Sequence, residues 1–96
     1  DVERSRGLGD VYKRQVLVQR FHIDTNHHMN NGKYILVAEE YLPENFKTES
    51  IRVEYKKAAV IGNMLYPEVY EQQNGVTIVL ADEQKVPYAI MQFRGK

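Results

Sequence analysis

The chain has 96 residues, of which 43% are hydrophobic, and its 13 Lys and Arg residues balance its 13 Asp and Glu residues. This composition is typical of one soluble globular domain, and the even charge argues against a nucleic-acid partner. The longest apolar stretch, 76–81, is far shorter than the roughly 20 residues of a membrane-spanning helix. The absence of cysteine excludes disulfides, thiolate metal sites and a cysteine nucleophile, and makes the cytoplasm the expected compartment.

The first fifteen residues differ from the rest of the chain and read DVERSRGLGDVYKRQ. This stretch mixes charges and glycines and shows neither a helical nor a strand period. It resembles translated sequencing-adapter sequence, and we expect either that or a disordered tail. One folded domain is therefore expected over residues 16–96.

The first predicted elements of the domain are a strand and a helix, separated by a polar segment. A strand is expected over 16–21, where Val16, Leu17, Val18 and Phe21 are apolar. The polar segment 22–32 follows and contains all three histidines of the chain. A helix is expected over 31–42, started by Asn30 or Asn31 as the cap and ended by Pro43. Its apolar stripe consists of Tyr34, Ile35, Ala38, Tyr41 and Leu42.

From residue 51 onward the pattern changes to strands. Ile51, Val53 and Tyr55 are expected to be buried, while the alternating residues Arg52, Glu54 and Lys56 face solvent. A second strand over 64–71 has two possible buried faces, one made of the odd-numbered and one of the even-numbered residues.

Two turns divide the end of the chain into further strands. Asn74-Gly75 predicts a type I′ hairpin into a strand over 76–80. A turn over 82–85 leads to the last strand, 86–93, with Pro87 near its start. The order of one strand, one helix and four strands predicts an α+β domain in which the helix lies across an antiparallel sheet.

The polar segment holds the candidate chemistry. Asp24, Asn26 and His28 alternate, so in extended backbone their side chains point the same way, and they lead into a helix N-terminus at Asn30 and Asn31. The free N–H groups of a helix start can stabilise negative charge on a carbonyl oxygen. A carboxylate and an imidazole beside them could activate water or attack an acyl carbon.

Three other interpretations of this segment remain open. Asp, Asn and Gly commonly serve only as turn and cap residues. His22, Asp24 and His28 could bind a metal ion, although their spacing matches no established ligand motif. The three histidines could also form a pH-sensing cluster.

Two stretches resemble one family. The run 24–31 (DTNHHMNN), followed by Lys33-Tyr34-Ile35, resembles the D-x-N-x-H-V-N-N-x-x-Y-I signature of acyl-acyl-carrier-protein thioesterases, particularly the bacterial members. The run 51–57 (IRVEYKK), followed by Gly62-Asn63, is similar to a strand and turn further along those proteins. The resemblance covers about residues 16–95.

The resemblance implies a hot-dog fold, an antiparallel sheet wrapped around one long central helix. It also implies hydrolysis of the thioester between a fatty acyl chain and acyl carrier protein, without a metal or other cofactor. Asp24 would be the nucleophile or general base, Asn26 and His28 would orient it and polarise the carbonyl, and backbone amides near Asn30 and Asn31 would form the oxyanion site.

The chain departs from the family in two respects. Plant members carry a Glu-Cys pair where this chain has Ala58 and Ala59, so neither position can be catalytic here. Members also have two tandem hot-dog domains, and this chain resembles the C-terminal one. We therefore expect a fragment with little activity alone.

Two partners are implied, acyl carrier protein and a second hot-dog unit, either the N-terminal domain or another copy of the chain. Lys33, Lys56 and Lys57 are candidates for contacting the acidic carrier. The alternative function is a non-catalytic acyl-binding or dimerising hot-dog domain. A hot-dog dehydratase ranks last because its histidine-phenylalanine-proline signature is missing.

Overall fold

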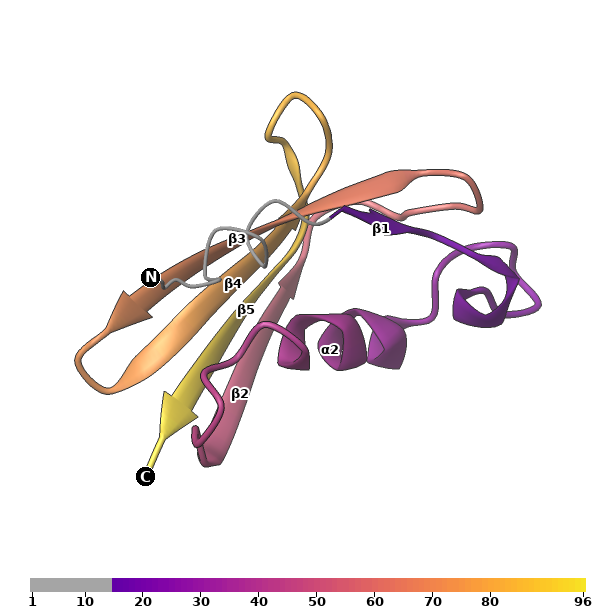
Figure 1. Cartoon of the computed structure of the whole chain (residues 1–96). Coiled ribbons are helices and arrows are strands. Elements are labelled where there is room, and N and C mark those ends of the chain that lie inside the picture. The colour runs from indigo at the N-terminus through magenta and orange to yellow at the C-terminus, as the bar shows by residue number, and fades with distance from the viewer. Residues whose placement is uncertain (1–14) are drawn as a thin grey trace.

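The computed structural model describes residues 15–96, so the tail or adapter expected over 1–15 lies almost entirely outside the described residues. One helix lies on one face of a twisted sheet (Figure 1). The elements in chain order are β1 (Val16–Leu17), the short 3-10 helix η1 (Arg20–His22), α2 (Asn31–Glu39), β2 (Thr48–Tyr55), β3 (Met64–Gln72), β4 (Gly75–Ala81) and β5 (Pro87–Gly95).

The strands form a single antiparallel sheet in the order β1-β3-β4-β5-β2. The predicted α+β order is confirmed, with α2 packed on the two central strands β4 and β5. The core lies between α2 and these strands, where Tyr34 and Ala38 meet Ile78, Leu80 and Met91 among other buried residues. Within residues 15–96, no helix is both long and apolar enough to span a membrane.

The helix α2 begins where the sequence predicts and ends earlier. Asn30 is the N-cap, and its side-chain oxygen accepts a hydrogen bond of 2.9 Å from the Gly32 N–H. The predicted stripe is confirmed, because Tyr34 and Ala38 are buried and Ile35, Tyr41 and Leu42 pack against the core. The helix ends at Glu39 instead of residue 42. Tyr41 and Leu42 therefore reach the core from the turn that precedes Pro43.

The strand β2 is less buried than its alternation predicts. Arg52, Glu54 and Lys56 are exposed as expected, but Ile51 and Tyr55 are also 38% and 42% exposed. The reason is that β2 is an edge strand, paired only with β5 in the described sheet. The helix α2 packs mainly on β4 and β5.

The hairpin between β3 and β4 forms one residue earlier than predicted. Gln72 pairs with Gly75, so the turn residues are Gln73 and Asn74. Neither Asn74 nor Gly75 has a positive φ, so the predicted type I′ turn is wrong. Gly75 is required for another reason, since a Cβ there would lie 2.3 Å from the carbonyl oxygen of Phe93 on β5. In β3 the odd-numbered face is the buried one, as Leu65 and Pro67 show.

The strand predicted over 16–21 is reduced to the two residues of β1. Val18 is buried beyond its end, whereas Phe21 lies in η1 and is 65% exposed. Phe21 is therefore not a core residue. The prediction that Pro87 begins the last strand is confirmed.

Candidate active site

The segment that carries Asp24, Asn26 and His28 is a tight turn and not extended backbone. A β-bridge joins Ile23 to Met29, the Asp24 N–H donates to the His28 carbonyl at 3.0 Å, and His27 has a φ of 68°. One carboxylate oxygen of Asp24 accepts a hydrogen bond of 2.9 Å from the Asn26 N–H. The prediction that extended backbone points these three side chains in one direction is therefore wrong, although the turn also places the three residues around one cleft.

Asp24, Asn26 and His28 all line one cleft of about 500 Å³. The cleft lies between this turn, the start of α2 and the end of β2. Its other lining residues are Met29, Asn30, Asn31, Tyr34, Tyr55, Lys56, Lys57 and Ala58. The predicted site residues thus share a concave surface with the helix N-terminus.

Some polar groups of the cleft residues are used in hydrogen bonds and others are open. The second carboxylate oxygen of Asp24 makes no hydrogen bond to any residue in 15–96, and no side-chain bond joins it to His28. The Asn30 N–H, one of the expected oxyanion donors, is used, because it donates to the His22 carbonyl at 2.8 Å. Asn31 is the first residue of α2, and its N–H has no hydrogen-bond acceptor within the described chain. An open carboxylate, an imidazole and one free amide therefore belong to residues that line the same cleft.

The back wall of the cleft depends on Tyr34, whose polar role the sequence does not reveal. Its hydroxyl accepts a hydrogen bond of 2.9 Å from the buried Ala59 N–H, and burial raises the pKa of the Tyr34 hydroxyl. The Ala59 carbonyl accepts a hydrogen bond of 2.8 Å from the Met29 N–H. The loop after β2 is thereby tied to both the helix and the turn. Spacing identifies Tyr34 only as a member of the apolar stripe.

Tyr55, from the edge strand, lines the cleft next to Tyr34. Its ring meets the ring of Tyr34 edge-on, with centroids 5.6 Å apart. Its hydroxyl donates to the Asn31 carbonyl at 3.1 Å. The start of α2 is therefore held against β2.

His22 supports the turn from behind and does not line the cleft. It is 4% exposed, and its Nδ1 accepts a hydrogen bond of 2.8 Å from the Gln19 N–H. Burial, together with the positive charge of Lys33, holds the pKa of His22 below its usual range. In the part of the chain that the structure describes, no three His, Asp or Glu side chains are grouped as metal ligands. His22, Asp24 and His28 thus do not form the ligand set considered above.

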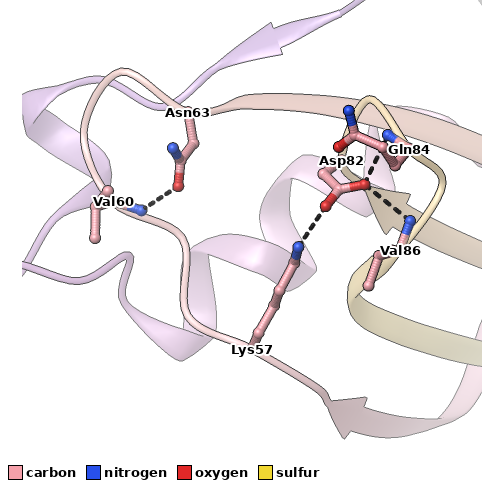
Figure 2. A network of polar contacts seen from close by, with 6 residues as sticks. All are labelled: Lys57, Val60, Asn63, Asp82, Gln84 and Val86. Carbon is pink, nitrogen blue, oxygen red and sulfur yellow. Dashed lines mark hydrogen bonds and ion pairs between the residues drawn. The ribbon is translucent and has the colours of Figure 1, made fainter.

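The three candidate carrier-contact lysines have different surroundings. Lys56 forms an ion pair with Glu54 at 2.7 Å. Lys57 forms an ion pair with Asp82, and the same carboxylate accepts hydrogen bonds of 2.9 Å from the Gln84 and Val86 N–H groups (Figure 2). The Lys57 Nζ also lies 4.7 Å from the centre of the Tyr88 ring. The Lys57 side chain therefore fastens the cleft wall to the β4–β5 turn, and it lowers the pKa of Asp82.

Comparison with solved structures identifies the fold. The chain superposes with a TM-score of 0.78 and 15% identity on an acyl-ACP thioesterase from Bacteroides thetaiotaomicron, over 86% of this chain and 36% of that one. YbaW, a probable thioesterase from Escherichia coli, gives 0.69 and 20%, with 83% and 77% coverage. The Streptococcus mutans protein smu.793, solved bound to acetyl CoA, gives 0.67 and 14%, with 85% and 79% coverage. The chain has the hot-dog fold that these structures share, as expected.

A family profile is more specific than the fold. The profile of the acyl-ACP thioesterase C-terminal domain matches residues 8–94. The chain therefore belongs to the acyl-ACP thioesterase C-terminal domain family. No curated protein sequence gives a significant match. The chain spans about a third of the length of the Bacteroides thioesterase.

Proposed function

We propose that this domain takes part in hydrolysing the thioester that joins a fatty acyl chain to acyl carrier protein, as a cytoplasmic enzyme of fatty acid synthesis. The observation that supports this function is the convergence of Asp24, Asn26 and His28 on one cleft at the start of α2. Membership of the acyl-ACP thioesterase family supports the choice of a thioester over other acyl substrates.

In the proposed reaction, Asp24 acts as a general base on a water molecule. Its second carboxylate oxygen has no partner within residues 15–96 and can accept a proton from that water. The water oxygen bonds to the thioester carbon as its proton passes to Asp24. The carbon–sulfur bond of the tetrahedral intermediate then breaks, and the leaving sulfur takes that proton from Asp24, so that a carboxylic acid and a free thiol are released. Asn26, His28 and the Asn31 N–H would stabilise the negative charge on the carbonyl oxygen. Water attack suits this cleft because Ala58 supplies no nucleophile to it.

We further propose that a second hot-dog unit pairs with the free edge of β2. This edge carries the partly exposed apolar residues Ile51 and Tyr55. The opposite edge is formed by the two-residue β1 and, beyond it, by β3, and it is less suited to pairing because β1 is short and Pro67 of β3 has no N–H. Since Tyr55 also lines the cleft, a strand added to β2 would extend the cleft wall. The partner is either an N-terminal domain or a second copy.

The Asp24→Asn variant tests the proposed reaction. The amide oxygen of Asn can still accept the Asn26 N–H, so the turn and the free energy of unfolding should change little. The rate of thioester hydrolysis of fatty acyl-acyl carrier protein should fall about 10²–10⁴-fold, measured as release of the free thiol of the carrier. Glu71→Gln, which removes an exposed carboxylate on β3 outside the cleft, is the matched control and should retain full activity.

Two outcomes would contradict the proposal. An Asp24→Asn rate equal to that of the unmodified chain would exclude Asp24 as the base. Binding of acyl carrier protein without release of thiol, even with a second hot-dog unit present, would favour the alternative of a non-catalytic acyl-binding domain.

A further inference from the structure

Phe21, which is exposed, and Lys33, which is partly exposed, form an aromatic and cationic surface beside the cleft. Phe21, on η1, is 65% exposed, the largest exposure among the large hydrophobic residues of the described chain. The Lys33 Nζ lies 5.6 Å from the centre of the Phe21 ring. Leu36, one helical turn after Lys33, is 55% exposed, and Arg20, next to Phe21, is exposed as well. We call Arg20, Phe21, Lys33 and Leu36 the η1–α2 surface.

The positive charge of this surface is not neutralised within residues 15–96. No carboxylate of that range lies within ion-pairing distance of Lys33 or Arg20. By contrast, Lys56 and Lys57, which line the cleft, are paired with Glu54 and Asp82. Contacting an acidic partner through Lys56 or Lys57 would first require breaking an existing ion pair. Lys33 and Arg20 could contact such a partner without breaking an ion pair within residues 15–96.

The η1–α2 surface lies close to the cleft but does not line it. Phe21 lies three residues before Asp24 in the sequence. The Lys33 N–H donates a hydrogen bond of 2.9 Å to the carbonyl of Asn30, which lines the cleft. None of the four residues of the surface is in the cleft lining. A protein bound here could therefore deliver a flexible acyl-bearing arm into the cleft without occupying the cleft itself.

We propose that the η1–α2 surface is the docking site for the acidic carrier protein that bears the acyl chain. The inference rests on the proposed function for its choice of partner. Phe21 and Leu36 would contact an apolar residue of the carrier, and Lys33 and Arg20 would pair with the surrounding carboxylates. An exposed aromatic flanked by cations matches such a partner in both polarity and charge, and aromatic and Arg residues dominate binding energy at protein interfaces.

The test compares Lys33→Glu with the matched control Lys47→Glu. Lys47 is an exposed lysine at the other end of β2 from the cleft. The affinity for the carrier is measured by titration with fluorescently labelled carrier protein. Turnover is measured with two thioesters, one linked to the carrier protein (fatty acyl-acyl carrier protein) and one without it (acyl-pantetheine). Lys33→Glu should weaken carrier binding and lower kcat/KM for the carrier-linked substrate about tenfold at low salt, and the loss should shrink at high salt. Carrier-free turnover should stay within about twofold.

A second variant, Phe21→Ser, tests the apolar part of the surface. It should also weaken carrier binding about tenfold while leaving the midpoint of thermal unfolding almost unchanged, because Phe21 is not a core residue. If Lys33→Glu or Phe21→Ser affects carrier binding no more than Lys47→Glu, the docking site is elsewhere. Equal losses with both substrates would assign Lys33 to the cleft. The inference would also be overturned if Lys33→Glu and Phe21→Ser weakened binding of the protein to anionic lipid vesicles and left its binding to the carrier protein unchanged.

The two proposals fail in different ways. Carrier binding that depends on Lys33 without any thiol release would retain the docking site and reject the hydrolase. Hydrolysis that is insensitive to Lys33 and Phe21 would retain the hydrolase and reject the docking site.

Discussion

Replacing Tyr34 by Phe removes one buried hydroxyl while preserving the ring that fills the core. Tyr34 is 2% exposed, and the Ala59 N–H that bonds to its hydroxyl belongs to a residue that is 0% exposed. In Tyr34→Phe this amide would stay buried without an acceptor. A buried polar group left unsatisfied costs about 1–3 kcal/mol. For a domain of this size, such a loss lowers the midpoint of thermal unfolding by about 5–20 °C.

Equilibrium unfolding in urea measures this loss directly, as a lower midpoint with an unchanged slope. Tyr55→Phe is the matched control, because it also removes one tyrosine hydroxyl bonded to the backbone, here as a donor to the Asn31 carbonyl, but from an exposed position. It should cost less than about 0.5 kcal/mol. If Tyr34→Phe is as stable as Tyr55→Phe, the Tyr34–Ala59 hydrogen bond does not hold the cleft wall.

Three further predictions follow from the packing, the titration and the sheet edge. Gly75→Ala should lower the free energy of unfolding by about 2 kcal/mol or more, because the new Cβ would lie 2.3 Å from the Phe93 carbonyl oxygen. Gly95→Ala, whose Cβ would lie 3.1 Å from the Phe46 ring, should cost less in the same urea titration. Because the folded state lowers the pKa of His22, the unfolded chain binds more protons, so stability should fall as the pH drops below the ordinary value of 6.5. His22→Gln should flatten this dependence, and a slope equal to that of the unmodified chain would refute the assignment. The free β2 edge predicts a sedimentation mass that rises with protein concentration and rises less in Ile51→Glu, whereas a constant monomer mass would argue against edge pairing.

The parts of the fold that were predicted correctly are those set by local periodicity. The helix and its stripe follow from spacing alone, because a 3.6-residue period has only one apolar face. The exposure of Ile51 and Tyr55 could not be predicted, since alternation gives the buried face of a strand but not its position at the edge of a sheet. Gly75 suggested a special turn, whereas its role is a close approach to a strand that follows much later in the chain.

The grouping of Asp24, Asn26 and His28 on one surface was expected from the sequence, but the backbone geometry that groups them was not. Asp24, Asn26 and His28 reach one cleft through a turn with a positive φ at His27, which side-chain alternation does not predict. The hydrogen bond from the Ala59 N–H to Tyr34 joins residues 25 positions apart, so no local pattern carries it. The catalytic roles of the site residues stay predictions.

The position of β5 in the sheet has a consequence for how the chain folds during synthesis. This strand, Pro87–Gly95, lies between β4 and β2 and pairs with both. The strand β2 leaves the ribosome early but has no partner until β5 emerges, so the cleft wall at Tyr55 is among the last parts to form. Loss of β5 would remove an interior strand of the sheet and leave β2 without a partner in the described sheet. Deletion of residues 87–95 should therefore prevent folding.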